Sequence, residues 1–293
     1  MLEIKDEARG LISHGVSACH GCGLEIVIRK VMDALDDDVI ILIPPGCAAL
    51  FSGYCKETNV KVPGYQGNLE NTAASASGIR AALKAKGNDH TTVLCFCGDG
   101  ATVDIGLQSL SGAFERNDKI LYVCYDNEAY MNTGIQGSSS TPLFAATTTT
   151  PGGKKVRRKD LTQIAIAHNI PYVATASAHN IADLQKKVKK AREADGPALL
   201  HIYAPCPTGW RSNPAKTIEI SRLAEQTGCW INFEYEDGKV TINSKVKELK
   251  PVEEYTKLQG RFKALTPEQK VALQEEVTSN YNATMKKLQF MSE

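Results

Sequence analysis

The feature that most constrains the fold is a series of short, continuously apolar segments that alternate with segments of helical periodicity. The apolar segments are rich in β-branched residues and cover residues 38–43, 91–97, 119–125, 171–176 and 198–203. Helical patterns occupy residues 24–35, 71–86, 105–116, 161–168 and 181–194. Strands that are apolar on both faces are typical of parallel sheets covered by helices. The alternation therefore predicts an α/β fold with a doubly wound parallel sheet.

The pattern changes after residue 206. Residues 230–242 predict a hairpin that turns at Asp237-Gly238. Residues 266–289 predict a helix, because the N-cap residue Thr266 is followed by a proline in the first turn. We expect one domain over residues 1–245 and a C-terminal helical arm over residues 246–293.

Composition excludes several classes of protein. With 42% hydrophobic and 23% charged residues, the chain has an ordinary globular composition. A net charge of +1 argues against electrostatic binding of nucleic acid. No apolar run approaches the roughly 20 residues that span a bilayer, and the N-terminus lacks the apolar core of a signal peptide. We therefore expect a cytoplasmic protein that binds neither membrane nor nucleic acid.

Two short polar motifs follow neighbouring apolar segments. Gly98-Asp99-Gly100 ends one predicted strand, and Asp126-Asn127 ends the next after 25 intervening residues (101–125). Ligands bind at the carboxyl edge of an open parallel sheet. The glycines let the backbone approach a phosphate, and the oxygens of Asp99 and Asn127 suit Mg²⁺ or Ca²⁺. The alternative interpretation is a plain turn at the glycines and a helix cap at Asp126-Asn127.

Nine cysteines form the second feature, and an odd number in a chain without a signal peptide is a poor disulfide framework. Cys19 and Cys22 form a CxxC turn, which holds zinc, an iron–sulfur cluster or a redox disulfide. Cys47 and Cys206 each follow a predicted strand at the same edge as Asp99. We expect these four thiolates to converge near that edge, and their spread fits a [4Fe–4S] cluster, with structural zinc as the alternative.

The remaining cysteines carry less information. Cys95, Cys97 and Cys124 lie inside predicted strands, where they are expected to be small buried hydrophobic residues. Cys55 and Cys229 have no assigned role.

Both motifs together resemble a known family. Gly98-Asp99-Gly100 and the downstream Asn127 resemble the thiamine-diphosphate signature. Over about residues 10–260, the chain is similar to the β subunits of 2-oxoacid:ferredoxin oxidoreductases, most closely those of pyruvate:ferredoxin oxidoreductase (pyruvate synthase). The matching segments are 18–23, 70–74, 98–100, 104–106, 126–134, 140–142 and 205–210. His20 and Ala101-Thr102 depart from the usual family residues, but neither replaces a ligand.

The resemblance implies a reaction and its partners. The implied reaction is the reversible oxidative decarboxylation of pyruvate with coenzyme A to acetyl-CoA and CO₂, with electrons passing through a [4Fe–4S] cluster to ferredoxin. A branched-chain 2-oxoacid or oxalate is the alternative substrate. The glutamate that activates the cofactor comes from the α subunit in this family, and no two-cluster ferredoxin module is found here. The resemblance therefore implies α, γ and δ subunits as partners, with the C-terminal arm as a contact surface.

The resemblance also assigns roles to residues. The implied Mg²⁺ ligands are Asp99, Asn127 and the carbonyl of Ala129, and the implied cluster ligands are Cys19, Cys22, Cys47 and Cys206. Asn132 occupies the position that faces the substrate and is the candidate catalytic residue, with a cap or turn as its alternative role. The other implied cofactor-binding positions are Gly46, Cys47, Gly98, Gly100, Ala101, Met131, Asn132 and Thr133.

Two questions stay open at this point. The basic run at residues 154–159 is either a docking patch for coenzyme A phosphates or acidic ferredoxin, or a solvated loop. The competing classes are a non-redox thiamine enzyme, which has no need of four converging cysteines, and a zinc-stabilised scaffold module. Iron, zinc and thiamine content distinguish them.

Overall fold

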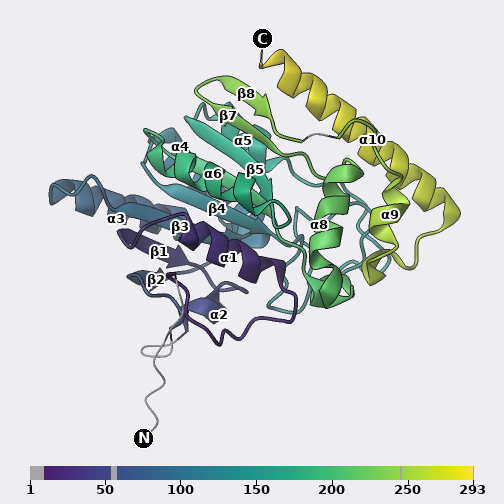
Figure 1. The fold of residues 1–293 in the computed structure, drawn as a ribbon, viewed down its shortest axis with the longest axis horizontal. Helices are drawn as coiled ribbons and strands as arrows, with labels where there is room; N and C mark the ends of the chain where they lie inside the picture. The colour runs from purple at the N-terminus through teal and green to yellow at the C-terminus, as the bar shows by residue number, and fades with distance from the viewer. Residues whose placement is uncertain (1–9, 54–57, 245, 293) are drawn as a thin grey trace, which may run out of the picture.

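The fold is built around one eight-stranded sheet (Figure 1). The computed structural model describes residues 10–53, 58–244 and 246–292, so Cys55 lies outside the described residues. The strand order is β2-β1-β3-β4-β6-β5-β7-β8. Six strands pair in parallel: β1 (Val39–Ile43), β2 (Gly64–Gln66), β3 (Thr92–Gly98), β4 (Leu121–Asp126), β5 (Tyr172–Ser177) and β6 (Ala198–Tyr203). The predicted parallel α/β sheet is confirmed.

The predicted hairpin is also confirmed, and it extends the same sheet. β7 (Phe233–Glu236) and β8 (Lys239–Ile242) turn at Asp237 and Gly238, both of which have positive φ. β7 pairs antiparallel with β5, so the sheet ends in an antiparallel edge. The hairpin therefore belongs to the main sheet.

Helices cover both faces of the sheet. On one face lie α1 (Gly23–Asp33) and α6 (Ile181–Glu193), whose buried residues share a cluster with β3, β4 and β6. On the other face lie α3 (Thr72–Ala85), α4 (Leu107–Glu115) and α5 (Leu161–Ala167). All five helices fall within a few residues of the predicted ranges. This two-sided cover is the doubly wound arrangement.

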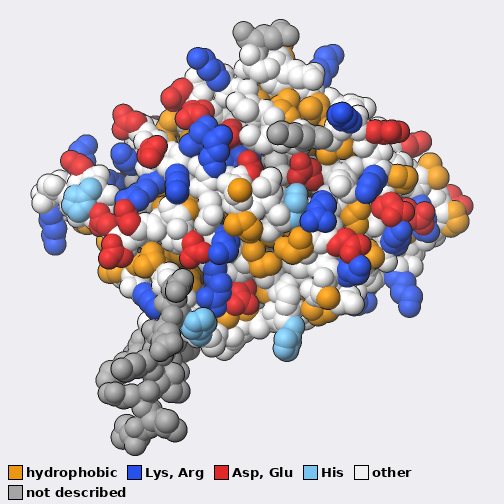
Figure 2. Space-filling view, in the orientation of Figure 1, with side chains coloured by type: hydrophobic (Ala, Val, Ile, Leu, Met, Phe, Trp, Pro, Cys, Tyr) orange, Lys and Arg blue, Asp and Glu red, His pale blue; other side chains and the backbone are white. Residues whose placement is uncertain are grey.

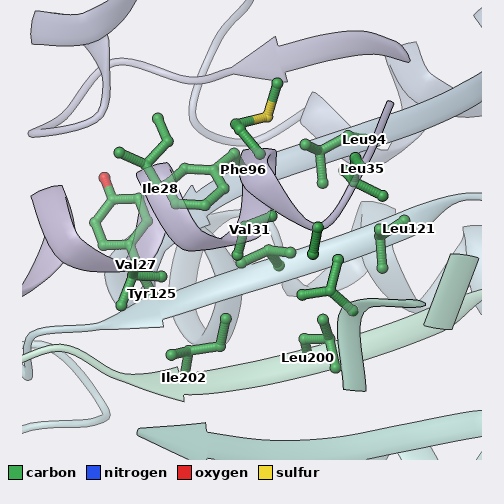
Figure 3. Close-up of a cluster of buried hydrophobic side chains, with 14 of the residues drawn as sticks. Val27, Ile28, Val31, Leu35, Leu94, Phe96, Leu121, Tyr125, Leu200 and Ile202 are labelled. Carbon is green, nitrogen blue, oxygen red and sulfur yellow. The ribbon is translucent and has the colours of Figure 1, made fainter. Parts of the chain in front are cut away.

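The packing in Figure 3 explains why the sequences of the strands are continuously apolar. Val27, Val31 and Leu35 of the α1 region pack against Phe96 of β3 and Ile202 of β6. Side chains alternate across a strand, so the intervening residues face the other helix layer. Cys95, Cys97 and Cys124 belong to that second core and are fully buried, which confirms their prediction as core residues. Burying one large apolar side chain contributes about 1.5–3 kcal/mol.

The C-terminal part forms a third cluster beside the sheet. It contains α8 (Thr217–Gln226), α9 (Val252–Thr256) and α10 (Pro267–Phe290), and α10 lies along one side of the molecule in Figure 1. The predicted start of α10 is confirmed by a capping box between Thr266 and Gln269. Short helical segments are α2 (Ala49–Ser52), η2 (Gly100–Ile105), α7 (Pro207–Trp210), η3 (Pro214–Lys216) and η4 (Gly260–Phe262).

Two further features describe the molecule as a whole. Within the described ranges, no helix combines the length and apolar character that crossing a membrane requires. On the face shown in Figure 2, basic and acidic side chains are interspersed.

Candidate active site

Three groups that are predicted to be oxygen ligands lie together where β3 and β4 end. Asp99 follows β3 directly, and Asn127 follows β4, the next strand of the sheet. The side-chain oxygen of Asn127 lies 2.8 Å from the carbonyl oxygen of Ala129 and 3.0 Å from Oδ1 of Asp99. Neighbouring ligands of an octahedral Mg²⁺, each 2.0–2.1 Å from the metal, are about 2.9 Å apart. We call Asp99, Asn127 and Ala129 the oxygen-ligand site.

The side-chain amide of Asn127 has two orientations that fit the neighbouring oxygens. With its oxygen inward it faces them as a third acceptor, and turned over its NH₂ group donates to both of them. Burial and the nearby Asp126 raise the pKa of Asp99 well above its usual range. Ser138 Oγ donates to Asp99 Oδ2 at 2.5 Å, but no basic side chain among the described residues pairs with Asp99. A divalent cation would keep Asp99 ionised, so the residues present fit Mg²⁺.

The segment after Asp99 winds differently from the prediction. The sequence predicts a helix from residue 105, whereas residues 100–105 already form the π-helix η2, which leads into α4. A Cβ atom on Gly100 would lie 2.4 Å from the ring of Tyr130, whose hydroxyl donates to the Gly100 carbonyl at 3.1 Å. π-helical turns are frequent at functional sites. Gly100 and Ala101 are thereby held beside the oxygen-ligand site.

Asp126 and Glu128 alternate with the proposed ligands Asn127 and Ala129 along the chain, and their carboxylates pair with basic side chains instead. Asp126 accepts from Arg158 Nη2 at 2.7 Å, and His201 Nε2 lies 2.7 Å from the same carboxylate. Glu128 pairs with Arg158 at 3.1 Å and with Arg261 at 2.6 Å. Burial alone would raise the pKa of Asp126, but Arg158 and His201 together lower it. Sequence analysis missed this network, because no local pattern links residues so far apart.

The basic run at residues 154–159 is partly internal: Lys154 is buried and Arg158 half-buried, whereas Lys155, Arg157 and Lys159 are exposed. Lys154 is buried and donates to the carbonyls of Ser138 and Thr141, each at 2.8 Å. Arg158 enters the network described above, and Lys159 donates to the carbonyl of Val103 at 2.5 Å. Neither the docking patch nor the solvated loop describes Lys154 and Arg158, while both interpretations stay open for the exposed cations. The positive charges of Lys154 and Arg158 balance buried acids and carbonyls.

The four-cysteine set comprises Cys19, Cys22, Cys47 and Cys206. Cys19 is exposed and the other three are half-buried. The amide of Gly23 donates to the carbonyl of Pro205 at 3.0 Å, which brings the CxxC turn beside Cys206. Burial, reinforced by the neighbouring thiols, raises the pKa of Cys47 to about 12 and that of Cys206 to about 11.

The set is not a compact metal site. Across residues 10–53, 58–244 and 246–292, no group of three or more His, Cys, Asp or Glu side chains is close enough to hold a metal ion. Ligation of a cluster by these four cysteines therefore stays a prediction. Cys229, which had no assigned role, is half-buried beside Thr227.

The oxygen-ligand site and the four-cysteine set touch through two residues. A Cβ atom on Gly209 would lie 2.1 Å from Sδ of Met131 and 3.3 Å from Sγ of Cys206. Trp210 Nε1 donates to the main-chain carbonyl of Asn127 at 2.9 Å. Met131, a predicted cofactor-binding residue, therefore packs against Gly209, which also adjoins the predicted cluster ligand Cys206.

The other predicted residues lie around this junction. Gly46 has a φ of +145°, and a Cβ atom on it would lie 3.4 Å from the hydroxyl oxygen of Tyr125. Thr133 donates to the side chain of Gln136 at 2.8 Å. Asn132 is exposed, and its side chain has no hydrogen bond to any described residue, so it caps no described helix. Its amide is available to a ligand.

Comparisons with known proteins define the class of protein. The family "thiamine pyrophosphate enzyme, C-terminal TPP binding domain" matches residues 45–202, which include β2 to β5, most of β6 and the oxygen-ligand site. A match over more than half of the chain places it among the thiamine-diphosphate enzymes.

Similar proteins identify the family to which the chain belongs within this class. The chain is 48% identical to pyruvate synthase subunit PorB of Methanothermobacter thermautotrophicus, covering 92% of this chain and 95% of the relative. It is also 48% identical to ketoisovalerate oxidoreductase subunit VorB of Pyrococcus abyssi, covering 93% and 91%. The chain belongs to the β subunits of the 2-oxoacid:ferredoxin oxidoreductases. It is thus a subunit of a multi-subunit oxidoreductase, which supports neither the scaffold module nor the non-redox enzyme.

A solved structure shares the fold. The 2-oxoglutarate:ferredoxin oxidoreductase from Magnetococcus marinus, with 2-oxoglutarate, coenzyme A and succinyl-CoA bound, superimposes with a TM-score of 0.60. Identity is 22%, and the match covers 75% of this chain and 82% of that chain.

Proposed function

We propose that this chain is the β subunit of a pyruvate:ferredoxin oxidoreductase and that it binds thiamine diphosphate, Mg²⁺ and one [4Fe–4S] cluster. The observation that carries the proposal is that Asp99, Asn127 and the Ala129 carbonyl meet directly after β3 and β4, while Cys206 follows β6, the strand next to β4. A hard-oxygen site suits a cation that also binds a diphosphate. A neighbouring set of thiols suits an electron acceptor.

Different residues have different proposed roles in binding the cofactor and the substrate. The oxygen-ligand site would hold Mg²⁺ and through it the diphosphate, while Gly98 and Gly100 keep the backbone close to the phosphates. Bound thiamine diphosphate supplies the decarboxylation chemistry, and the cluster carries electrons away. The free amide of Asn132 would hydrogen-bond the 2-oxoacid. Met131 would contact the cofactor on the side that faces Cys206.

Partner subunits complete the site. The proposed assembly contains α, γ and δ subunits, because the glutamate for cofactor activation and the onward clusters to ferredoxin belong to other chains. Coenzyme A would accept the acetyl group, and the reaction would run in both directions. The C-terminal arm, with α10 along one side of the molecule, is the proposed contact surface.

The substrate needs its own test, because a ketoisovalerate oxidoreductase subunit is as similar to this chain as a pyruvate synthase subunit is. We would measure kcat/KM of the anaerobically purified complex for pyruvate, 2-ketoisovalerate and oxalate, with coenzyme A and ferredoxin reduction as the readout. The proposal predicts that pyruvate has the highest value. A higher value for 2-ketoisovalerate would assign the branched-chain substrate and contradict the pyruvate proposal.

A further inference from the structure

We propose that Arg261 is a positioning residue that fixes two segments at once: the proposed metal-binding loop at residues 127–129 and the short helix α7, which follows Cys206. The inference rests on the proposed function, which supplies the roles of those segments. Arg261 lies in η4, far along the chain from both. It is only 3% exposed, although it carries a charge.

The first contact is with the metal-binding loop. Arg261 Nη2 donates to Glu128 Oε2 at 2.6 Å. Glu128 stands between two proposed metal ligands and has a φ of +66°, a left-handed conformation that L-residues other than Asn and Asp adopt rarely. That turn points the Glu128 side chain away from the site while Asn127 and the Ala129 carbonyl point into it. The ion pair holds the turn in place.

The second contact is with Trp210, the last residue of α7. The guanidinium of Arg261 lies 3.9 Å from the centre of the Trp210 ring. Trp210 in turn donates from Nε1 to the Asn127 carbonyl, and its own amide donates to the Cys206 carbonyl at 2.9 Å. One side chain therefore braces a proposed Mg²⁺ ligand both through Glu128 and through Trp210.

Arg261 is itself held rigidly. Its Nε donates to Gln259 Oε1 at 2.9 Å, and its Nη2 donates to the Tyr255 hydroxyl at 3.1 Å. A planar guanidinium makes these contacts and stacks on the indole at the same time, which a lysine ammonium cannot do. The arginine type, and not only its charge, is therefore expected to matter.

The test compares R261M and R261K with a matched control, R157M. Arg157 is an exposed arginine whose ion pair with Glu276 lies outside the network. Each anaerobically purified complex is stripped of cofactor, and Mg²⁺-dependent binding of thiamine diphosphate is titrated. Partners behind metal ligands typically affect affinity by about 10–100-fold. We expect a loss in that range for R261M, a smaller loss for R261K, and a change below about twofold for R157M.

The same samples report iron per β chain, the EPR spectrum of the reduced clusters and the melting temperature. R261M is expected to shift the EPR signal of the cluster at Cys206, whereas R157M is not. Wild-type affinity and an unchanged spectrum in R261M would overturn the inference. If R261M does not fold, R261K decides: wild-type affinity and spectrum in a normally melting R261K would also overturn it. Failure of the wild-type complex to bind thiamine diphosphate would instead overturn the proposed function.

Discussion

The oxygen-ligand site and the four-cysteine set are held in different ways. Asp99 and Asn127 are almost completely buried, and ion pairs to Arg158 and Arg261 brace the loop that contains the site. The cysteines lie on three loops, Cys19 is exposed, and the loops are joined by main-chain contacts such as that of Gly23 with Pro205. Mg²⁺ demands near-ideal geometry, which favours a prebuilt site. We expect the thiols to reach their final geometry only when a cluster binds.

The largest expected effect comes from removing a ligand of the prebuilt site. The substitution Asp99→Asn removes the only acidic ligand of the three, so we expect Mg²⁺-dependent binding of thiamine diphosphate to weaken by at least about 100-fold, more than the loss typical of an outer partner. The measurement is a titration of the stripped complex. Asp118→Asn, whose carboxylate pairs with Arg116 at a distance from the site, serves as control. Unchanged affinity in Asp99→Asn would show that the metal lies elsewhere.

Removing a thiol is expected to separate the two sites. In Cys47→Ser, the iron bound by the β chain should be lost, while affinity for thiamine diphosphate stays within about threefold, because the oxygen ligands are braced independently. Iron analysis and cofactor titration on one preparation check both. The control is Cys97→Ala, which shortens a buried core residue of β3. Iron loss in the control but not in Cys47→Ser would contradict the assignment.

The pH dependence of metal binding should differ between the sites. Because burial raises the pKa of Cys47 to about 12 and that of Cys206 to about 11, both thiols are protonated at neutral pH. A soft metal must displace those protons, so affinity should rise with pH, by up to about tenfold per pH unit for each proton released. Cd²⁺–thiolate absorbance of iron-depleted complex between pH 7 and 9 measures this. A flat profile would show that the thiols are already ionised.

One substitution is expected to affect the oxygen-ligand site and the four-cysteine set together. Gly209 packs between Met131 and Cys206, and a Cβ atom there would lie 2.1 Å from Met131 Sδ. Gly209→Ala must shift one neighbour or both, so we expect roughly tenfold weaker cofactor binding together with an altered cluster spectrum, since small displacements have large effects at reacting centres. Gly78→Ala in α3, where the added Cβ meets open space, is the control. An effect on neither site would disprove the contact.

The sequence predicted those parts that depend on local pattern. Five of the six parallel strands were located because each is an apolar segment buried between two helix layers, whereas β2, which is exposed at all three of its residues, was missed. Asp99 and Asn127 were found because ligands at the carboxyl end of parallel strands follow directly from topology. The π-helix at Gly100 was missed, because no local sequence pattern separates it from the α-helix that it leads into.

The supporting network was also beyond sequence analysis. Arg261 and Glu128 are 133 residues apart, and their pairing depends on how the C-terminal segment packs. The internal roles of Lys154 and Arg158 were missed, because a Gly- and Thr-rich segment with five cations gives no sign of which of them are buried. Here the cations of Lys154 and Arg158 compensate acceptors that the fold had buried.

The most direct test of the central claim is the content of the intact complex. We would purify it anaerobically and measure iron, sulfide, zinc and thiamine per β chain, together with the EPR spectrum after adding pyruvate and coenzyme A. The account predicts thiamine, about four iron and four sulfide per β chain beyond the partners' share, and a pyruvate-dependent radical. Zinc in place of iron, or the absence of thiamine, would contradict it.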